Sequence, residues 1–330
     1  MPISRLKSNK PRTSTVRGKR LGITMGDPAG VGPEVILKAM SRRSIKRRDD
    51  FLVIGSRFVL ADAAKKIGSS LSGMNIVDLD NVPHKNFKFG GISSPCATAS
   101  YEYIKEALKL LKAKTIQGLV TAPISKQALK ESGFPFGGHT EILARSCGIK
   151  DTVMMFVAGN FRVAIQTRHI PLKEVARTLT SDKIYRTIVI LDTALERYFR
   201  IKHPKTGICG LNPHAGEGGA LSGEEGKIIT PAIKKAKNRG INAIGPLPAD
   251  AVFYDVYHGK YDAVISMYHD QGLGPFKMLY RDTGVNVTLG LPFVRTSPDH
   301  GTAFDIAGKG IANPSSMIHA INLASNMLSR

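Results

Sequence analysis

The chain has 330 residues, of which 42% are hydrophobic and 22% charged, and its formal net charge is +21. This composition is typical of a globular protein and excludes a fibrous or wholly disordered chain. No apolar run approaches the roughly 20 residues that cross a bilayer, so we expect no membrane span. Three scattered cysteines without a CxxC pair argue against a disulfide framework and favour a reducing, cytoplasmic location.

The positive charge is partly concentrated at the N-terminus, where residues 1–20 carry seven basic side chains and no acidic one. This segment lacks the apolar core of a secretory signal, and we expect a solvated, disordered tail, with a transit peptide or a nucleic-acid arm as alternatives. The remaining charge has no aromatic interleaving, so we expect no nucleic-acid partner. A positive field suits anionic ligands such as phosphate esters and dinucleotides.

Short apolar runs with strand character alternate with stretches of helical periodicity from residue 21 onward. The predicted strands cover residues 21–25, 51–55, 75–79, 116–121, 152–157, 162–166, 207–211, 263–267 and 285–289. The predicted helices cover residues 33–40, 57–67, 101–112, 181–197 and 315–328. This alternation predicts an α/β fold with a largely parallel sheet. No linker divides the chain, and residues 134–139 are the best candidate for a crossing between two domains.

The first predicted strand leads into residues 26–34, which we call the glycine-rich loop. Its glycines allow close backbone approach, Pro33 suits a helix N-terminus, and such a terminus favours anions. The loop lacks the GxGxxG pattern, so it does not predict a Rossmann site. On the sequence alone, a ligand loop and a structural tight turn are equally good interpretations.

Three histidines, His169, His214 and His269, each lie just past the end of a predicted strand. Parallel strands would bring these positions to one edge of the sheet, where α/β proteins bind ligands. Three neutral imidazoles with an open position are typical of a catalytic divalent metal site. A single histidine in such a place is more often a capping or core residue, but the common placement of all three favours metal binding.

Other polar residues suit an anionic substrate. His139 and Thr140 open a predicted helix, where they could bind an anion, although Thr140 could also serve only as a cap. Lys277, Asn286 and Arg295 lie beside or within the last strands and suit a carboxylate or phosphate, with solvated surface charge as the alternative. Residues 299–314, which we call the C-terminal loop, mix small and polar residues without an amphipathic period and predict a loop and short helix shaped to a ligand.

Together these motifs resemble the 4-hydroxythreonine-4-phosphate dehydrogenase family of vitamin B6 biosynthesis, which shares the fold of isocitrate and isopropylmalate dehydrogenases. The resemblance rests on residues 24–34, 137–141, 212–217 and 268–272 and keeps their order to the C-terminus. It implies two α/β domains, residues 21–133 with 298–330 and residues 134–297, and an active site in the cleft between them. It also implies a homodimer whose second subunit completes the active site.

The resemblance assigns roles to single residues. The implied metal ligands are His169, His214 and His269. The implied substrate-binding residues are His139, Thr140, Lys277, Asn286 and Arg295. The implied residues for NAD or NADP are His300, Gly301, Thr302, Asp305 and Asn313. The candidates for orienting a ligand histidine or moving a proton are Asp270, Asp250 and Lys277.

The implied reaction is NAD(P)-dependent oxidation of 4-phosphooxy-L-threonine to a 3-oxo acid, which decarboxylates to 3-amino-2-oxopropyl phosphate. One divalent metal, zinc, magnesium, cobalt or manganese, would lower the pKa of the substrate hydroxyl. A related activity on 4-phospho-D-threonate or erythronate stays open, because no residue in the sequence distinguishes an amino group from a hydroxyl. From another class, a histidine-triad metal hydrolase or lyase without nicotinamide also stays open, although it would not need the C-terminal loop.

Overall fold

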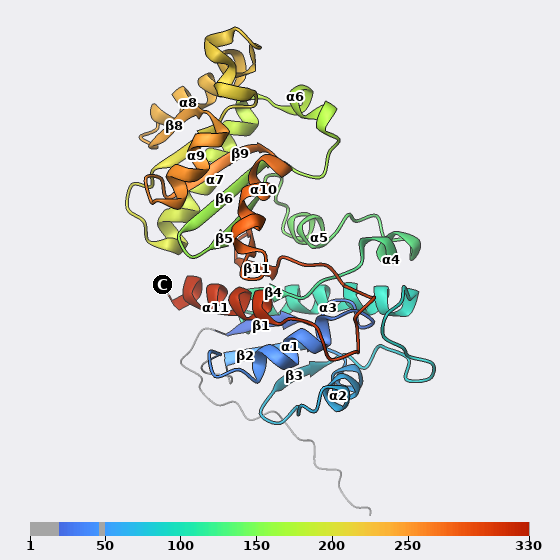
Figure 1. The fold of residues 1–330 in the computed structure, drawn as a ribbon. Coiled ribbons are helices and arrows are strands. Elements are labelled where there is room, and N and C mark those ends of the chain that lie inside the picture. The colour runs from blue at the N-terminus through green and yellow to red at the C-terminus, as the bar shows by residue number, and fades with distance from the viewer. Residues whose placement is uncertain (1–19, 46–49, 330) are drawn as a thin grey trace, which may run out of the picture.

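The computed structural model describes residues 20–45 and 50–329 (Figure 1). The predicted N-terminal tail, except for its last residue, lies outside these residues. Strands are β1 (Leu21–Thr24), β2 (Phe51–Gly55), β3 (Asn75–Asp78), β4 (Gly118–Thr121), β5 (Val153–Ala158), β6 (Phe161–Thr167), β7 (Thr206–Cys209), β8 (Ala243–Leu247), β9 (Ala263–Tyr268), β10 (Val285–Leu289) and β11 (Val294–Pro298). Helices are α1 (Gly32–Met40), α2 (Arg57–Lys66), α3 (Ser94–Lys112), α4 (Lys126–Glu131), α5 (His139–Ser146), α6 (Val175–Thr178), α7 (Ser181–Phe199), α8 (Thr230–Lys237), α9 (Ala249–Tyr257), α10 (His269–Tyr280) and α11 (Ser315–Ser329).

The strands of the described residues form a single sheet in the order β3-β2-β1-β4-β11-β10-β5-β6-β9-β7-β8. Both ends of the sheet are parallel, and the three central pairings, β11 with β10, β10 with β5 and β5 with β6, are antiparallel. The predicted α/β class with a mostly parallel sheet is therefore confirmed. The antiparallel centre follows from short chain reversals, such as the two-residue connection Gly159–Asn160 between β5 and β6.

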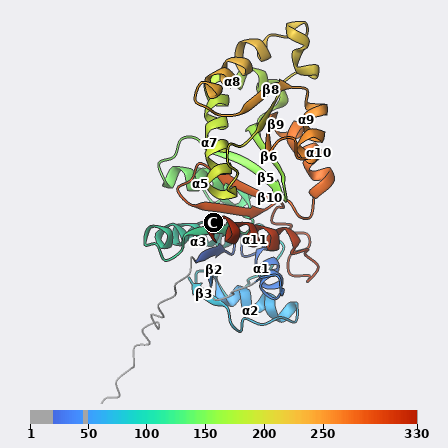
Figure 2. The same cartoon turned by 90° about the vertical axis from the view of Figure 1, so that its left-hand side faces the viewer.

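Helices cover the sheet at both ends of the molecule (Figures 1 and 2). α3 packs on β1 and β2, while α11 packs on β4, β10 and β11. At the other end, α7 packs on β5 and β6, and α9 and α10 pack on β9 and β6. Because β1, β4 and β5 are buried along their whole length, they read as continuous apolar runs in the sequence.

Most predicted elements agree with the structure to within three residues at their ends. α3 begins seven residues earlier than predicted, because the Ser93 side chain accepts a hydrogen bond from the Cys96 backbone and a proline occupies the first turn. The sequence pattern missed β8 and β11, whose Gly-Pro pair and polar side chains interrupt an apolar run. It also missed the helices α4, α6, α8, α9 and α10, of which α10 contains Pro275.

No helix among the described residues is long and apolar enough to span a membrane. The two-domain division at residues 133 and 298 stays a prediction, because one sheet runs without a break through both parts. The cytoplasmic location likewise stays a prediction.

Candidate active site

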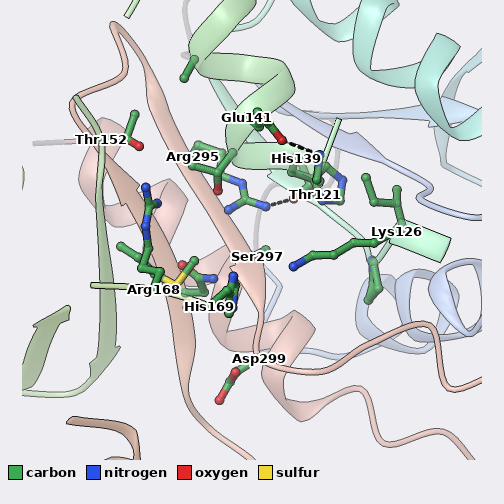
Figure 3. A pocket seen from close by; sticks show the side chains of 18 of the residues that line it. Thr121, Lys126, His139, Glu141, Thr152, Arg168, His169, Arg295, Ser297 and Asp299 are labelled. Carbon is green, nitrogen blue, oxygen red and sulfur yellow. Dashed lines mark hydrogen bonds between the residues drawn. The ribbon is translucent and has the colours of Figure 1, made fainter. Parts of the chain in front are cut away.

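A cleft of about 920 Å³ opens where the antiparallel centre of the sheet meets α4, α5 and α10 (Figure 3). Its floor is one face of three adjacent strands. Ser297 on β11 pairs in register with Asn286 on β10, which pairs with Phe156 on β5, and all three line the cleft. Arg295 and Met154 lie two residues away on the same strands and face the same way. The site is thus built on strand faces as well as on strand ends.

Arg295 is a buried cation on this floor, with 3% of its surface exposed. One guanidinium nitrogen donates to Thr288 Oγ1 at 2.9 Å and the other to Thr121 Oγ1 at 2.6 Å. Nε has no hydrogen-bond partner among the described residues, and burial lowers the pKa of Arg295 to about 10. A buried guanidinium that is held by hydroxyls and lacks a carboxylate partner is ready for an anionic ligand.

His139 and Thr140 open α5 at the edge of the cleft, as predicted. Gly138 precedes the helix with φ +144°, and Thr140 makes no capping hydrogen bond, so the capping interpretation is not supported. His139 Nε2 is buried without a partner among the described residues. Burial, followed by the charges of Arg295 and Lys126, lowers the pKa of His139 well below its usual range, so the imidazole is neutral at pH 7.

The structure brings two of the three predicted metal ligands together. The rings of His169 and His269 have centroids 5.6 Å apart, and both line the cleft. Asp270 Oδ1 lies 2.7 Å from His269 Nδ1, which leaves Nε2 of that ring for another partner. Burial is the main cause that lowers the pKa of His169.

His214 lies apart from this pair. β6, β9 and β7 are parallel neighbours in that order, so all three histidines do follow strands at one edge of the sheet. However, residues 214–218 all have positive φ, and His214 is exposed and does not line the cleft. The part of the chain that the structure describes holds no cluster of three or more metal-binding side chains. The role of His214 therefore stays a prediction.

Among the three predicted catalytic residues, all of which the structure describes, Lys277 lines the cleft, and Asp270 and Asp250 do not. Its Nζ lies 3.2 Å from Asp299 Oδ1, and burial, partly offset by Lys277, raises the pKa of that carboxyl. Asp270 does not line the cleft itself, but its carboxylate contacts the ring of His269, which does. Asp250 is exposed in the first turn of α9 and does not line the cleft.

The C-terminal loop is tied to the glycine-rich loop and to α1. Val31 donates its backbone N–H to the Thr302 carbonyl at 2.9 Å. Glu34, which is 2% exposed, accepts hydrogen bonds from the backbone of Gly310 and Ala312. The loop contains turns and no helix. Of the predicted cofactor residues, the two that line the cleft are His300 and Gly301, and those that do not are Thr302, Asp305 and Asn313.

Sequence reasoning missed four cations that line the cleft: Lys126, Arg145, Lys150 and Arg168. Arg168 directly precedes His169, and Lys126 begins α4, five residues beyond the end of β4. The strand-end rule that singled out the histidines would also have found these two. Burial lowers the pKa of Arg168.

Comparison with known proteins first shows a likeness of fold. The solved structure of the EutD phosphotransacetylase from Staphylococcus aureus aligns with a TM-score of 0.55 at 14% sequence identity, over 94% of this chain and 94% of that one. At this identity the likeness concerns the fold alone. A narrower match follows from the sequence. The family described as "Pyridoxal phosphate biosynthetic protein PdxA" matches residues 38–324. The chain belongs to this family, and the resemblance predicted from its motifs is confirmed.

Similar relatives carry two different names. The 4-hydroxythreonine-4-phosphate dehydrogenase of Geobacter metallireducens is 41% identical over 323 residues, 93% of this chain and 95% of that protein. The D-threonate 4-phosphate dehydrogenase of Cupriavidus necator is 42% identical over 326 residues, 94% of this chain and 97% of that protein. A solved 4-hydroxythreonine-4-phosphate dehydrogenase from Klebsiella pneumoniae has a TM-score of 0.88 at 34% identity, covering 96% of this chain and 100% of that one.

Proposed function

We propose that this chain is an NAD(P)-linked, divalent-metal-dependent dehydrogenase that oxidises a four-carbon hydroxy acid phosphorylated at C4. The observation that carries the proposal is the cleft itself. There a buried Arg295 without a carboxylate partner, a pair of histidines and the start of the C-terminal loop meet around one space. Family membership supports the same reaction class.

The residues present fit a divalent ion in part. His169 and His269 supply two imidazoles at a suitable separation, and Asp270 orients one of them. Among the described residues no third metal-binding side chain joins this pair, and we propose that the third ligand is His214 of a second copy of the chain. Imidazole ligands favour zinc or cobalt over magnesium.

The residues present also fit a dinucleotide beside the metal. The backbone of Gly30 lies against the C-terminal loop, because a Cβ on Gly30 would meet the Thr302 carbonyl oxygen at 3.0 Å. Gly301 has open space around it, and the buried Nε2 of His300 has no partner among the described residues. The cofactor, NAD or NADP, would accept the hydride, and this chemistry belongs to the cofactor.

The side chains of the cleft have separate tasks in this reaction. Arg295 and Lys277 bind the carboxylate and phosphate, and Asn286 donates to the same oxygens. His139 is neutral, so its buried Nε2 serves as a hydrogen-bond partner and adds no charge. Lys277 Nζ, next to Asp299, is placed to return a proton after oxidation. The metal, when bound, lowers the pKa of the substrate hydroxyl and stabilises negative charge during decarboxylation.

Two substrates are candidates. The sequence favours 4-phosphooxy-L-threonine, whose 3-oxo acid would lose carbon dioxide to give 3-amino-2-oxopropyl phosphate, as in pyridoxine biosynthesis. The charge of the cleft favours D-threonate 4-phosphate, because its lining holds six basic side chains and only two carboxylates. The names of the relatives support both candidates at similar identity.

A homodimer is part of the proposal. The exposed apolar side chains of α9 and α10 are Tyr254, Tyr257, Met278 and Leu279. The two helices meet around Phe161, whose ring contacts both Tyr257 and Tyr280. An apolar surface on neighbouring helices close to the cleft suits a second copy of the chain.

The test is the formation of NADH or NADPH from a panel of phosphorylated four-carbon hydroxy acids, with zinc, cobalt, manganese and magnesium added singly to metal-stripped protein. We expect at least one substrate to reduce NAD or NADP. We also expect the His269→Ala variant to react about a hundredfold more slowly than the wild-type protein. Absence of any reduced cofactor would refute the dehydrogenase. Metal-dependent release of phosphate without a cofactor would support the hydrolase alternative.

A further inference from the structure

We propose that Arg168 is a specificity-determining residue that binds the anionic end of the substrate and makes the site select a hydroxy acid phosphate over the corresponding amino acid phosphate. The inference rests on the proposed function and deepens it, since it concerns the substrate of the same cleft. None of the sequence motifs assigns a role to this arginine.

The position of Arg168 is fixed by its neighbours. It follows β6 directly, and the last residue of that strand, Thr167, donates its hydroxyl to the Met267 carbonyl at 2.7 Å on β9. The arginine lines the cleft and is only partly exposed. In Figure 3 its side chain extends along the wall of the cleft toward Thr152, on the side of the floor that also carries Arg295.

Arg168 has no counter-charge of its own. Within residues 20–45 and 50–329, no hydrogen bond or ion pair joins its guanidinium to another side chain or carbonyl. Keeping a guanidinium partly out of water without a partner is unfavourable, so the arginine is expected to be completed by an anion from solution. Its planar fork matches a carboxylate or phosphate with two parallel hydrogen bonds.

The whole lining of the cleft has the same excess of positive charge. The cations are Lys126, Arg145, Lys150, Arg168, Lys277 and Arg295, and the carboxylates are Glu141 and Asp299. Both carboxylates are already engaged, Asp299 with Lys277 at 3.2 Å and Glu141 with the backbone N–H of Gly137. No free carboxylate of the described lining is left to receive a substrate ammonium group.

The two candidate substrates differ in this respect. Both carry a carboxylate and a phosphate, but 4-phosphooxy-L-threonine also carries an ammonium group where D-threonate 4-phosphate has a hydroxyl. Two like charges about 10 Å apart at an effective dielectric constant of about 20 repel each other enough to change an affinity roughly tenfold. Removing the charge of Arg168 should therefore weaken binding of the hydroxy acid more than binding of the amino acid.

The experiment measures equilibrium binding of both compounds by calorimetry to the full-length, zinc-loaded protein and to Arg168→Gln, Arg168→Lys and the control Arg239→Gln. Arg239 is an exposed arginine two residues beyond the end of α8 that does not line the cleft. We expect the wild-type protein to bind D-threonate 4-phosphate at least about tenfold more tightly, and Arg168→Gln to reduce this ratio about tenfold. Arg168→Lys should retain most of the preference for D-threonate 4-phosphate, and Arg239→Gln should leave this preference unchanged.

Two outcomes overturn the proposal: tighter binding of 4-phosphooxy-L-threonine by the wild-type protein, or an unchanged ratio in Arg168→Gln. Thermal melting of each variant checks folding, and Arg168→Lys, with its retained charge, tests the electrostatic cause even if Arg168→Gln is unstable. Turnover of the same compounds is recorded separately. Absence of turnover with both compounds would refute the proposed dehydrogenase activity. The ratio of the two binding affinities would still test the role of Arg168, because it is measured without turnover.

Discussion

Asp27, in the glycine-rich loop, is a carboxylic acid with 1% of its surface exposed. Oδ1 accepts a hydrogen bond from the Ala29 backbone at 3.0 Å, and the buried Oδ2 has no partner among the described residues. Burial, partly offset by that hydrogen bond, raises the pKa of Asp27 from 3.8 to about 6. The folded chain therefore holds this proton more tightly than the unfolded chain.

The sign of the pH effect follows from this shift. Between the unfolded and folded pKa values the folded state binds more protons, so stability falls as pH rises through that window and stays lower above about pH 6. Asp27→Asn keeps an acceptor for Ala29 and removes the charge. We expect it to raise the free energy of unfolding by about 2–3 kcal/mol near pH 8 and to change it little near pH 4. Urea unfolding at both pH values measures this, with the exposed Asp282→Asn as control. An equal effect at both pH values would contradict the account.

The sequence singled out residues whose chemistry and placement both pointed to a ligand site, and their roles in binding stay predictions. His139, Asn286 and Arg295 line the cleft as predicted. Arg168 and Lys126 were missed although they also follow strands, because arginine and lysine are common on protein surfaces and their residue type alone does not indicate a binding site. The burial of Arg295 could not be predicted from the sequence either, because it depends on how other elements pack around β11.

At the scale of elements, α1 holds the C-terminal loop in place. Lys38 Nζ donates to the carbonyls of Gly310 and Ala312, each at 2.8 Å, and to Glu34 Oε1 at the same distance. Glu34 in turn accepts from the two backbone N–H groups of the same residues. One helical turn thus satisfies four backbone groups of a loop that has no hydrogen-bonded ladder of its own.

Lys38→Met should loosen this loop without altering the floor of the cleft. We expect the KM for NAD(P) to rise about tenfold with little change in kcat, because the loop that we propose receives the cofactor would have to be ordered on binding. Amide hydrogen exchange at Gly310 and Ala312 should become faster. Lys109→Met, which removes an exposed ion pair with Glu106, is the matched control. Unchanged exchange and an unchanged KM would show that α1 does not position the loop.

The positions of the strands in the sequence were easier to predict than whether neighbouring strands run parallel or antiparallel. Apolar runs such as β5 are visible because burial on both faces selects them. Whether two consecutive strands pair antiparallel depends on how short the connection between them is. The connection Gly159–Asn160 is only two residues long, so β6 pairs antiparallel with β5. The antiparallel centre that results is what places Asn286 beside Ser297 on the cleft floor. A fully parallel sheet would have left the site to strand ends alone.

At the scale of the whole molecule, His214 does not line the cleft that holds His169 and His269, and the proposed metal site therefore takes it from a second copy. β9 lies between β6 and β7, and the positive-φ residues 214–218 hold His214 on the surface. A single sequence shows that three histidines follow parallel strands, but it does not show which copy of the chain each one serves. The proposed dimer resolves this, with His169 and His269 from one subunit and His214 from the other.

This arrangement predicts complementation between inactive variants. His214→Ala and His269→Ala should each lack turnover while remaining folded and dimeric. Co-expressed in equal amounts, they should recover about a quarter of wild-type activity, because about half of the dimers are mixed and each mixed dimer holds one complete site. The matched control combines His169→Ala with His269→Ala, whose residues belong to the same half of the site, so no mixed dimer has a complete site. Activity in the control, or none in the first mixture when its mixed dimers are isolated, would refute a metal site shared between subunits.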